Sequence, residues 1–194
     1  MAQNAIALGK APSEGTWTVD AAHTNVGFVA RHLMVTKVRG HFTDVDGEVR
    51  IGETPEDSSV EVRIGTASID SGQPDRDTHL RSPDFLDVEK FPSMTFKSTL
   101  VEVTGDNTLK LKGDLTLLDV TKPVVLDVEY EGLTQQAPFG SRAGFSATTE
   151  IDREDWGLTW NMALETGGVL VGKKVKIELD VQLVHQEETT EEVA

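Results

Sequence analysis

Apolar and polar side chains alternate along most of this chain, and that period of two constrains the fold more than any other feature. From Thr16 onward no long stretch keeps the three-and-four spacing of an amphipathic helix. In residues 174–184 every second side chain is apolar, and Lys, Glu, Asp and Gln stand between. Comparable faces recur in residues 60–64, 109–117, 124–130 and 143–151. The pattern predicts an all-β domain, a meander of antiparallel strands.

Two details favour closure of the sheet on itself. The apolar set moves from even to odd positions between Phe96 and Val101, which predicts a bulge or bend near Ser98. Gly113 falls on the apolar face of a Leu-rich strand, where a missing side chain permits curvature or leaves room for another group. We therefore predict an antiparallel barrel with short helical insertions, and a two-sheet sandwich is the alternative.

Turns and insertions interrupt the alternation. Asp46-Gly47 predicts a tight hairpin, and residues 105–107 predict a slightly longer one. Residues 73–92 are dense in charge, and Ser82-Pro83 within them is typical of a helix start, with Ser as N-cap and Pro in the first turn. Residues 153–172 form a second irregular stretch, rich in Trp and Gly. Either segment could plug or cap an end of a barrel.

The composition excludes several classes of function. The chain has 194 residues, and 33 acidic against 18 basic side chains give a formal charge of −15. Nucleic-acid binding depends on Lys and Arg that neutralise phosphates, so DNA and RNA are not expected partners. Without Cys, the chain has no disulfide, zinc-thiolate site or thiol nucleophile. No apolar run approaches the ~18 residues that a membrane-spanning helix needs.

The two ends of the chain differ from its body. We expect residues 1–14 to form a flexible N-terminal segment and residues 15–184 to form the barrel domain. Residues 185–194 carry four Glu and are expected to be an acidic disordered tail. The first ten residues lack the basic and apolar regions of a secretory signal, which leads to the expectation of a cytoplasmic protein.

A series of motifs runs through residues 16–184. It starts with Trp17-x-x-Asp20-x-x-His23-Thr24 and Phe28-x-x-Arg31-His32-Leu33. Its most specific part is Asp77-x-His79-Leu80-Arg81-Ser82-x-Asp84-Phe85, and Arg153-x-x-Trp156-Gly157 follows later. In this order the motifs resemble those of the YceI-like family, whose members adopt a lipocalin-like antiparallel barrel and include polyisoprenoid-binding proteins.

The resemblance implies that an isoprenoid lipid, a polyprenyl phosphate or a quinone, is sequestered or carried in the barrel interior without catalysis. An apolar interior would favour such a ligand, because each buried CH₂ contributes roughly 0.8 kcal/mol. The candidate lining side chains are Phe28, Phe42, Phe96, Leu115, Phe145, Trp156 and Trp160. The alternative is a stress-related protein whose barrel is filled by its own side chains, as in other small barrels.

The polar head group of such a lipid would need hydrogen-bond donors at the mouth of the barrel. Arg31, His32, His79 and Arg81 could supply them, and Arg can bind oxygens through two parallel hydrogen bonds. The competing interpretation is that His79 and Arg81, with neighbouring aspartates, pin the inserted segment to the barrel.

The histidines raise the alternative of a His-dependent metalloprotein or enzyme, because His is the commonest metal ligand. His23, His32, His41 and His79 match no HExxH-type spacing, and the chain has no Gly-x-Ser-x-Gly elbow. We therefore predict no enzymatic activity, no cofactor and no metal. A homodimer is compatible with the resemblance and would cover an exposed edge.

Overall fold

We describe the protein by a computed structural model, which covers residues 11–136, 138–165 and 167–186. Most of these residues lie in eleven strands, with one α-helix and four short 3₁₀ turns. The strands are β1 (Gly15–Val19), β2 (Asn25–His32), β3 (Thr36–Phe42), β4 (Val45–Ile51), β5 (Ser59–Gly65), β6 (Ile69–Asp70), β7 (Ser93–Val103), β8 (Thr108–Leu117), β9 (Val120–Gln136), β10 (Gly140–Asp152) and β11 (Val171–His185). The helical segments are α1 (Pro74–Arg81), η1 (Ala21–His23), η2 (Pro55–Asp57), η3 (Thr66–Ser68) and η4 (Arg153–Trp156).

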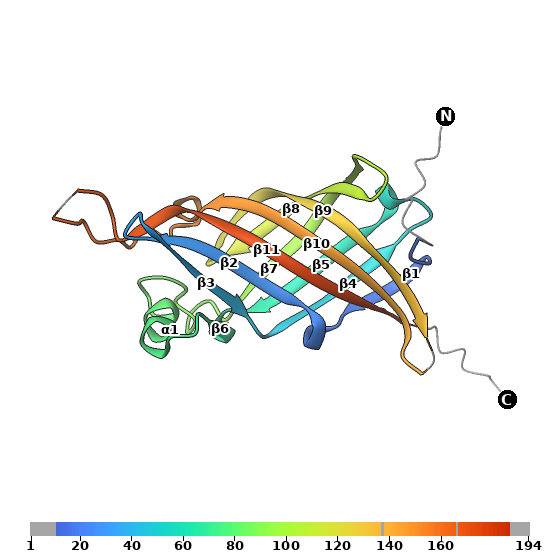
Figure 1. Cartoon of the computed structure of the whole chain (residues 1–194), viewed down its shortest axis with the longest axis horizontal. Coiled ribbons are helices and arrows are strands. Elements are labelled where there is room, and N and C mark those ends of the chain that lie inside the picture. Colours follow the sequence, from blue (N-terminus) through green and yellow to red (C-terminus); the bar gives the residue numbers. More distant parts are fainter. Residues whose placement is uncertain (1–10, 137, 166, 187–194) are drawn as a thin grey trace.

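The sheet closes into a barrel, which confirms the predicted fold class. Eight strands follow one another in the order β1-β4-β5-β7-β8-β9-β10-β11, and β11 pairs again with β1 through Trp17↔His185 to Val19↔Leu183. Every pairing between these strands is antiparallel. The remaining strands, β2, β3 and β6, continue from the free part of the β11 edge (Figure 1). All eleven strands of the described residues belong to this one sheet, so the sandwich alternative is wrong.

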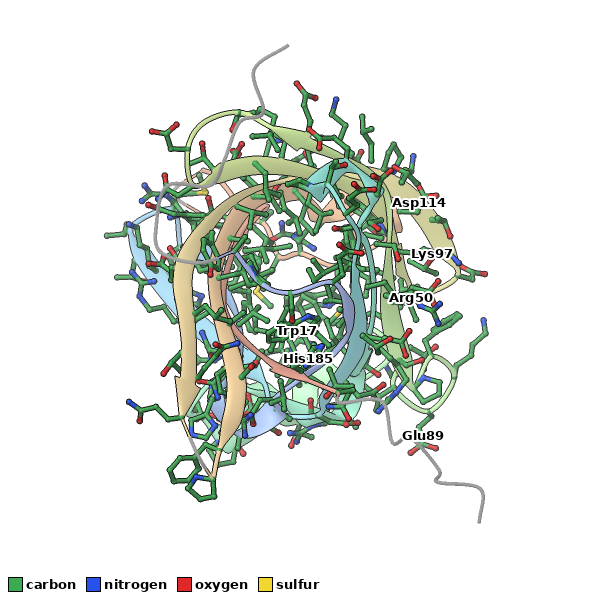
Figure 2. The ribbon with its side chains drawn as sticks, turned by 90° about the vertical axis from the view of Figure 1, so that its right-hand side faces the viewer. Trp17, Arg50, Glu89, Lys97, Asp114 and His185 are labelled. Atoms are coloured by element: carbon green, nitrogen blue, oxygen red, sulfur yellow. The ribbon has the colours of Figure 1, made fainter. Side chains whose placement is uncertain are left out.

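Strand alternation separates an apolar inner face from a polar outer face. Arg50, Lys97 and Asp114 are exposed and project away from the barrel (Figure 2). Their chain neighbours Val49, Phe96 and Leu115 lie in the hydrophobic clusters inside. Because successive side chains of a strand point to opposite faces, this arrangement is the one that the period of two predicts.

Register shifts occur where the alternation slips. The β7–β8 pairing shifts between Ser98 and Leu100, which confirms the bulge predicted near Ser98. A second shift lies in the β9–β10 pairing, between Gly144 and Phe145. Strand β9 has one extra residue at this point. Tyr130 and Leu133 therefore both face inward, although one position is even-numbered and the other odd-numbered.

The hairpin predicted at Asp46-Gly47 is wrong, because both residues lie inside β4 and pair with Arg63 and Val62 of β5. A Cβ on Gly47 would stand 2.8 Å from the carbonyl oxygen of Glu61 and 2.9 Å from the Val62 side chain. The glycine therefore serves close strand packing rather than a turn. The turn predicted at residues 105–107 does connect β7 and β8.

The inserted helix starts nine residues earlier than the Ser82-Pro83 signal predicts. Helix α1 starts after Gln73, whose side-chain carbonyl accepts from the backbone N–H of Arg76 at 2.8 Å, and Pro74 takes the first helical position. Ser82 is the C-terminal cap, and its hydroxyl donates to the carbonyl of His79 at 2.7 Å. Pro83 instead follows the end of the helix and begins a turn, in which the backbone N–H of Phe85 donates to the carbonyl of Ser82 at 3.0 Å.

The boundaries at the chain ends are sharper than the sequence suggests. Strand β11 extends to His185, and Gln186 donates its backbone N–H to the carbonyl of Thr16 at 2.9 Å. The predicted tail, residues 185–194, therefore begins inside a paired strand, and its residues 187–194 lie outside the described residues. The same holds for residues 1–10 of the predicted N-terminal segment.

Candidate functional site: the inner face of the barrel

Two phenylalanine rings lie flat along the barrel wall instead of crossing its interior. A Cβ on Gly40 would stand 2.4 Å from Cζ of Phe28, and a Cβ on Gly113 would stand 2.5 Å from Cζ of Phe96. Each ring therefore covers a glycine on the neighbouring strand, where only a missing side chain leaves space. Phe96 thus fills the space that the sequence predicts beside Gly113, and its ring does not extend across the centre of the barrel.

Many inward side chains are only partly buried. This group shares the inner strand faces and comprises Phe28, Val62, Phe96, Phe145, Val175, Ile177, Leu179 and Val181. Because the paired strands shield these side chains from outside, their remaining exposure faces the interior. A core filled by its own side chains would leave such residues fully buried. The inner face is consequently an apolar lining that a ligand can contact.

The other predicted lining residues divide into core and rim. Phe42, Leu115 and Trp156 are buried, with 8%, 9% and 3% of their surface exposed. Phe145 is partly buried, and its ring centroid lies 5.3 Å from that of Tyr130. Trp160 is partly buried at the edge of the largest cluster. Whether any of these side chains contacts a ligand stays a prediction.

An aromatic group marks the rim of the barrel beside α1. The His79 ring lies 4.6 Å from the Trp160 ring and 5.1 Å from the Phe85 ring, edge-on to both. Its Nε2 is 2.8 Å from a carboxylate oxygen of Asp84. Side chains from α1 and from the segment after η4 therefore meet at this rim, as the two irregular sequence stretches suggest.

The predicted head-group donors are not equally available. The guanidinium of Arg81 donates to the backbone carbonyls of Ala67 at 2.8 Å and Ile69 at 2.6 Å, which ties the end of α1 to β6. The carboxylate of Asp77, 7% exposed, accepts from the backbone N–H of Ser71 at 2.9 Å. These contacts favour the pinning interpretation for Arg81 and Asp77.

The two donors on β2 face opposite sides of the strand. His32 is half-buried and shares its strand face with Phe28, whereas Arg31 is exposed on the outer face. Since a strand turns successive side chains to opposite faces, the pair cannot enclose one head group together. His32 is the member that faces the interior.

Aromatic side chains pack into a buried cluster near the end of the barrel where β1 begins and β11 ends. Trp17 and Tyr130 have no exposed surface, and burial raises the pKa of Tyr130. The Trp17 ring lies 4.8 Å from the His185 ring (Figure 2). Neither Trp17 nor Tyr130 is among the predicted site residues. Their positions at the ends of alternating runs are the only sequence signal for this role.

Sequence reasoning also missed the part played by Arg153. Its side chain is 3% exposed, and its guanidinium donates to the carbonyls of Gly172 at 3.0 Å and of Leu158. Burial lowers the pKa of Arg153, although the neighbouring Asp152 and Glu154 counteract it. Arg153 holds the segment that follows η4 against the start of β11.

Two hollows lie beside the barrel. One, of about 680 Å³, is lined by the β6–α1 connection and includes Asp77 and Arg81. The other, of about 400 Å³, lies over β2 and β3 and includes Arg39 and Glu178. Both are bordered in part by charged side chains: Asp70, Asp77 and Arg81 in the first, and Arg39, Asp70 and Glu178 in the second.

The described part of the chain brings no three His, Asp or Glu side chains together in an arrangement that could hold a metal ion. Within the same residues, no helix is long and apolar enough to cross a membrane.

Closed antiparallel topology and an apolar inner face define a β-barrel of the type that can enclose a ligand. The family model described as YceI-like domain matches residues 17–183. A UPF0312 protein of Vibrio cholerae is 38% identical over 156 residues, covering 79% of this chain and 82% of that protein. The chain belongs to the YceI-like family.

Solved structures share the same fold. A YceI protein of Campylobacter jejuni matches with a TM-score of 0.70 and 28% identity, covering 92% of this chain and 99% of that one. A domain from Saccharophagus degradans, described as polyisoprenoid binding, matches with a TM-score of 0.68 and 13% identity. That match covers 88% of this chain and 98% of the domain, and at this identity it shows the fold alone.

Proposed function

We propose that this protein binds an isoprenoid lipid in the interior of its barrel and sequesters or carries it without chemical change. The observation that carries the proposal is the partly exposed apolar lining, with the rings of Phe28 and Phe96 laid against the wall. The family assignment and the description of the Saccharophagus domain support it.

The length of the barrel suits a long chain better than a compact ligand. Strand β11 has 15 residues, which at a rise of ~3.3 Å and a tilt of ~40° span roughly 38 Å of the barrel axis. The ligand would enter beside α1, where His79 and Trp160 form the rim. A polyprenyl phosphate or a quinone would place its head group there.

Native mass spectrometry with organic extraction, on protein gently purified from its own host, tests the proposal. We expect a prenyl species near one per chain, whose mass identifies tail and head group together. Protein that is empty and also refuses added prenyl lipids would overturn it. The barrel would then be filled in solution, and protein partners and metals would be the next candidates.

A further inference from the structure

The β2–β3 hairpin ends in large apolar side chains that face solvent. Leu33, Met34 and Val35 are 41%, 53% and 78% exposed. Met162, 55% exposed, belongs to the neighbouring loop, which is joined to the hairpin by the Leu33 N–H donating to the carbonyl of Leu170 at 2.8 Å. We call Leu33, Met34, Val35 and Met162 the apolar tip. It lies at the left end of the barrel in Figure 1, the end that also carries α1.

The backbone of this turn is poorly suited to the residues it carries. Leu33 and Met34 have φ of 52° and 60°, and the N–H of Val35 donates to the carbonyl of His32 at 3.1 Å. This is the tight hairpin turn with two left-handed residues, a conformation that Asn-Gly adopts readily and bulky side chains adopt at a cost. Strain and exposure together indicate that the apolar side chains serve a contact outside the barrel.

The charge around the apolar tip differs from that of the rest of the chain. Residues 21–43 contain no Asp or Glu, although the whole chain has 33. They carry Arg31, Lys37 and Arg39. Arg39 contacts Glu178 at 3.5 Å, whereas no ion pair among the described residues includes Arg31 or Lys37, both exposed. The apolar tip with the exposed side chains of Arg31 and Lys37 behind it fits the surface of an anionic bilayer.

We propose that the apolar tip docks this protein on anionic membranes, with Arg31 and Lys37 facing lipid phosphates. The net charge of −15 does not prevent docking, because at physiological salt exposed charges more than ~8 Å from the membrane are largely screened. The proposal builds on the proposed function, since a lipid could then pass between bilayer and barrel at the rim beside α1.

Flotation of the full chain with vesicles tests the docking. The vesicles are phosphatidylcholine alone or an equal mixture with phosphatidylglycerol. We expect binding to the mixed vesicles that weakens as salt rises. The double variant L33N/M34G places a favoured turn sequence at the tip, so it should keep or raise the melting temperature while binding about tenfold less. The double variant R31Q/K37Q should lose the salt-dependent part of the binding to mixed vesicles.

Phe139 provides the matched control for the apolar tip. It is 67% exposed in the β9–β10 hairpin, at the opposite end of the barrel (Figure 1), so Phe139→Glu should leave vesicle binding unchanged. Wild-type protein that binds neither kind of vesicle, or L33N/M34G that binds as wild type, overturns the proposal. So does a dimer that L33N/M34G converts to monomer, since the occupant is then a second copy.

Failure of docking and failure of lipid binding are measured separately. Prenyl lipid delivered in detergent bypasses the bilayer, and its uptake depends on the barrel interior alone. Uptake without vesicle binding would refute the docking and leave the proposed function standing.

Discussion

The indole N–H of Trp156 donates a hydrogen bond of 3.1 Å to the backbone carbonyl of Leu115. The two residues are 41 positions apart, and both belong to the largest hydrophobic cluster. This bond, together with the burial of Trp156, fixes the turn η4 against β8.

Trp156→Phe is expected to lower the free energy of unfolding by about 2–4 kcal/mol, because it removes buried ring volume and the hydrogen bond to the Leu115 carbonyl. Urea denaturation monitored by circular dichroism measures this. Trp160→Phe is the control, since Trp160 is only partly buried, and it should cost about 1 kcal/mol. Equal losses would contradict the role assigned to the Trp156–Leu115 bond.

Phe145→Arg should abolish uptake of prenyl lipid, because it places a charge on the apolar lining. Val125→Arg is the control: Val125 is 40% exposed on the neighbouring strand β9 and points outward. Binding is followed by native mass spectrometry, and circular dichroism verifies the fold of both variants. If folded Phe145→Arg binds like wild type, Phe145 does not line the ligand site.

Arg81→Ala should weaken a phosphorylated prenyl lipid and a hydrocarbon of equal length by the same factor. The reason is that Arg81 already donates to the carbonyls of Ala67 and Ile69, whose loss should cost about 1–3 kcal/mol of stability. Paired titrations of the two ligands measure the ratio. A selective loss of the phosphorylated ligand would instead make Arg81 a head-group donor.

The interactions of Asp20 lead us to expect that folding stability depends on pH. Burial would raise the pKa of Asp20, but hydrogen bonds from His23 and Gln182, both at 2.9 Å, outweigh burial and hold the pKa below its ordinary value. In the unfolded chain Asp titrates near ~3.9, so ionised Asp20 stabilises the fold fully above about pH 5. That contribution is lost as pH falls through the lower folded pKa.

Asp20→Asn should therefore cost about 1 kcal/mol of stability at pH 7, and the difference from wild type should shrink at about pH 3. Urea denaturation at both pH values measures the change. Asp106→Asn, in the exposed β7–β8 turn, is the control. A difference that stays constant between the two pH values would contradict the assignment.

The strands and the faces that they turn inward follow from the local sequence pattern. Alternation in residues 174–184 predicts the face that β11 turns inward, and the slip between Phe96 and Val101 predicts the bulge at Ser98. Both are local properties, because side-chain direction along a strand follows from position alone. The family motifs likewise predicted a single antiparallel barrel, which the pairing of β1 with β11 confirms.

The roles of single residues within the barrel depend on long-range contacts. Gly47 resembles a turn residue in sequence, yet it packs against β5; Pro83 resembles a helix start, yet Pro74 begins the helix. Arg81 resembles a free donor until the carbonyls of Ala67 and Ile69 are placed beside it. Alternation along one strand predicts which way a side chain points. It does not predict which residue of a distant segment the side chain contacts.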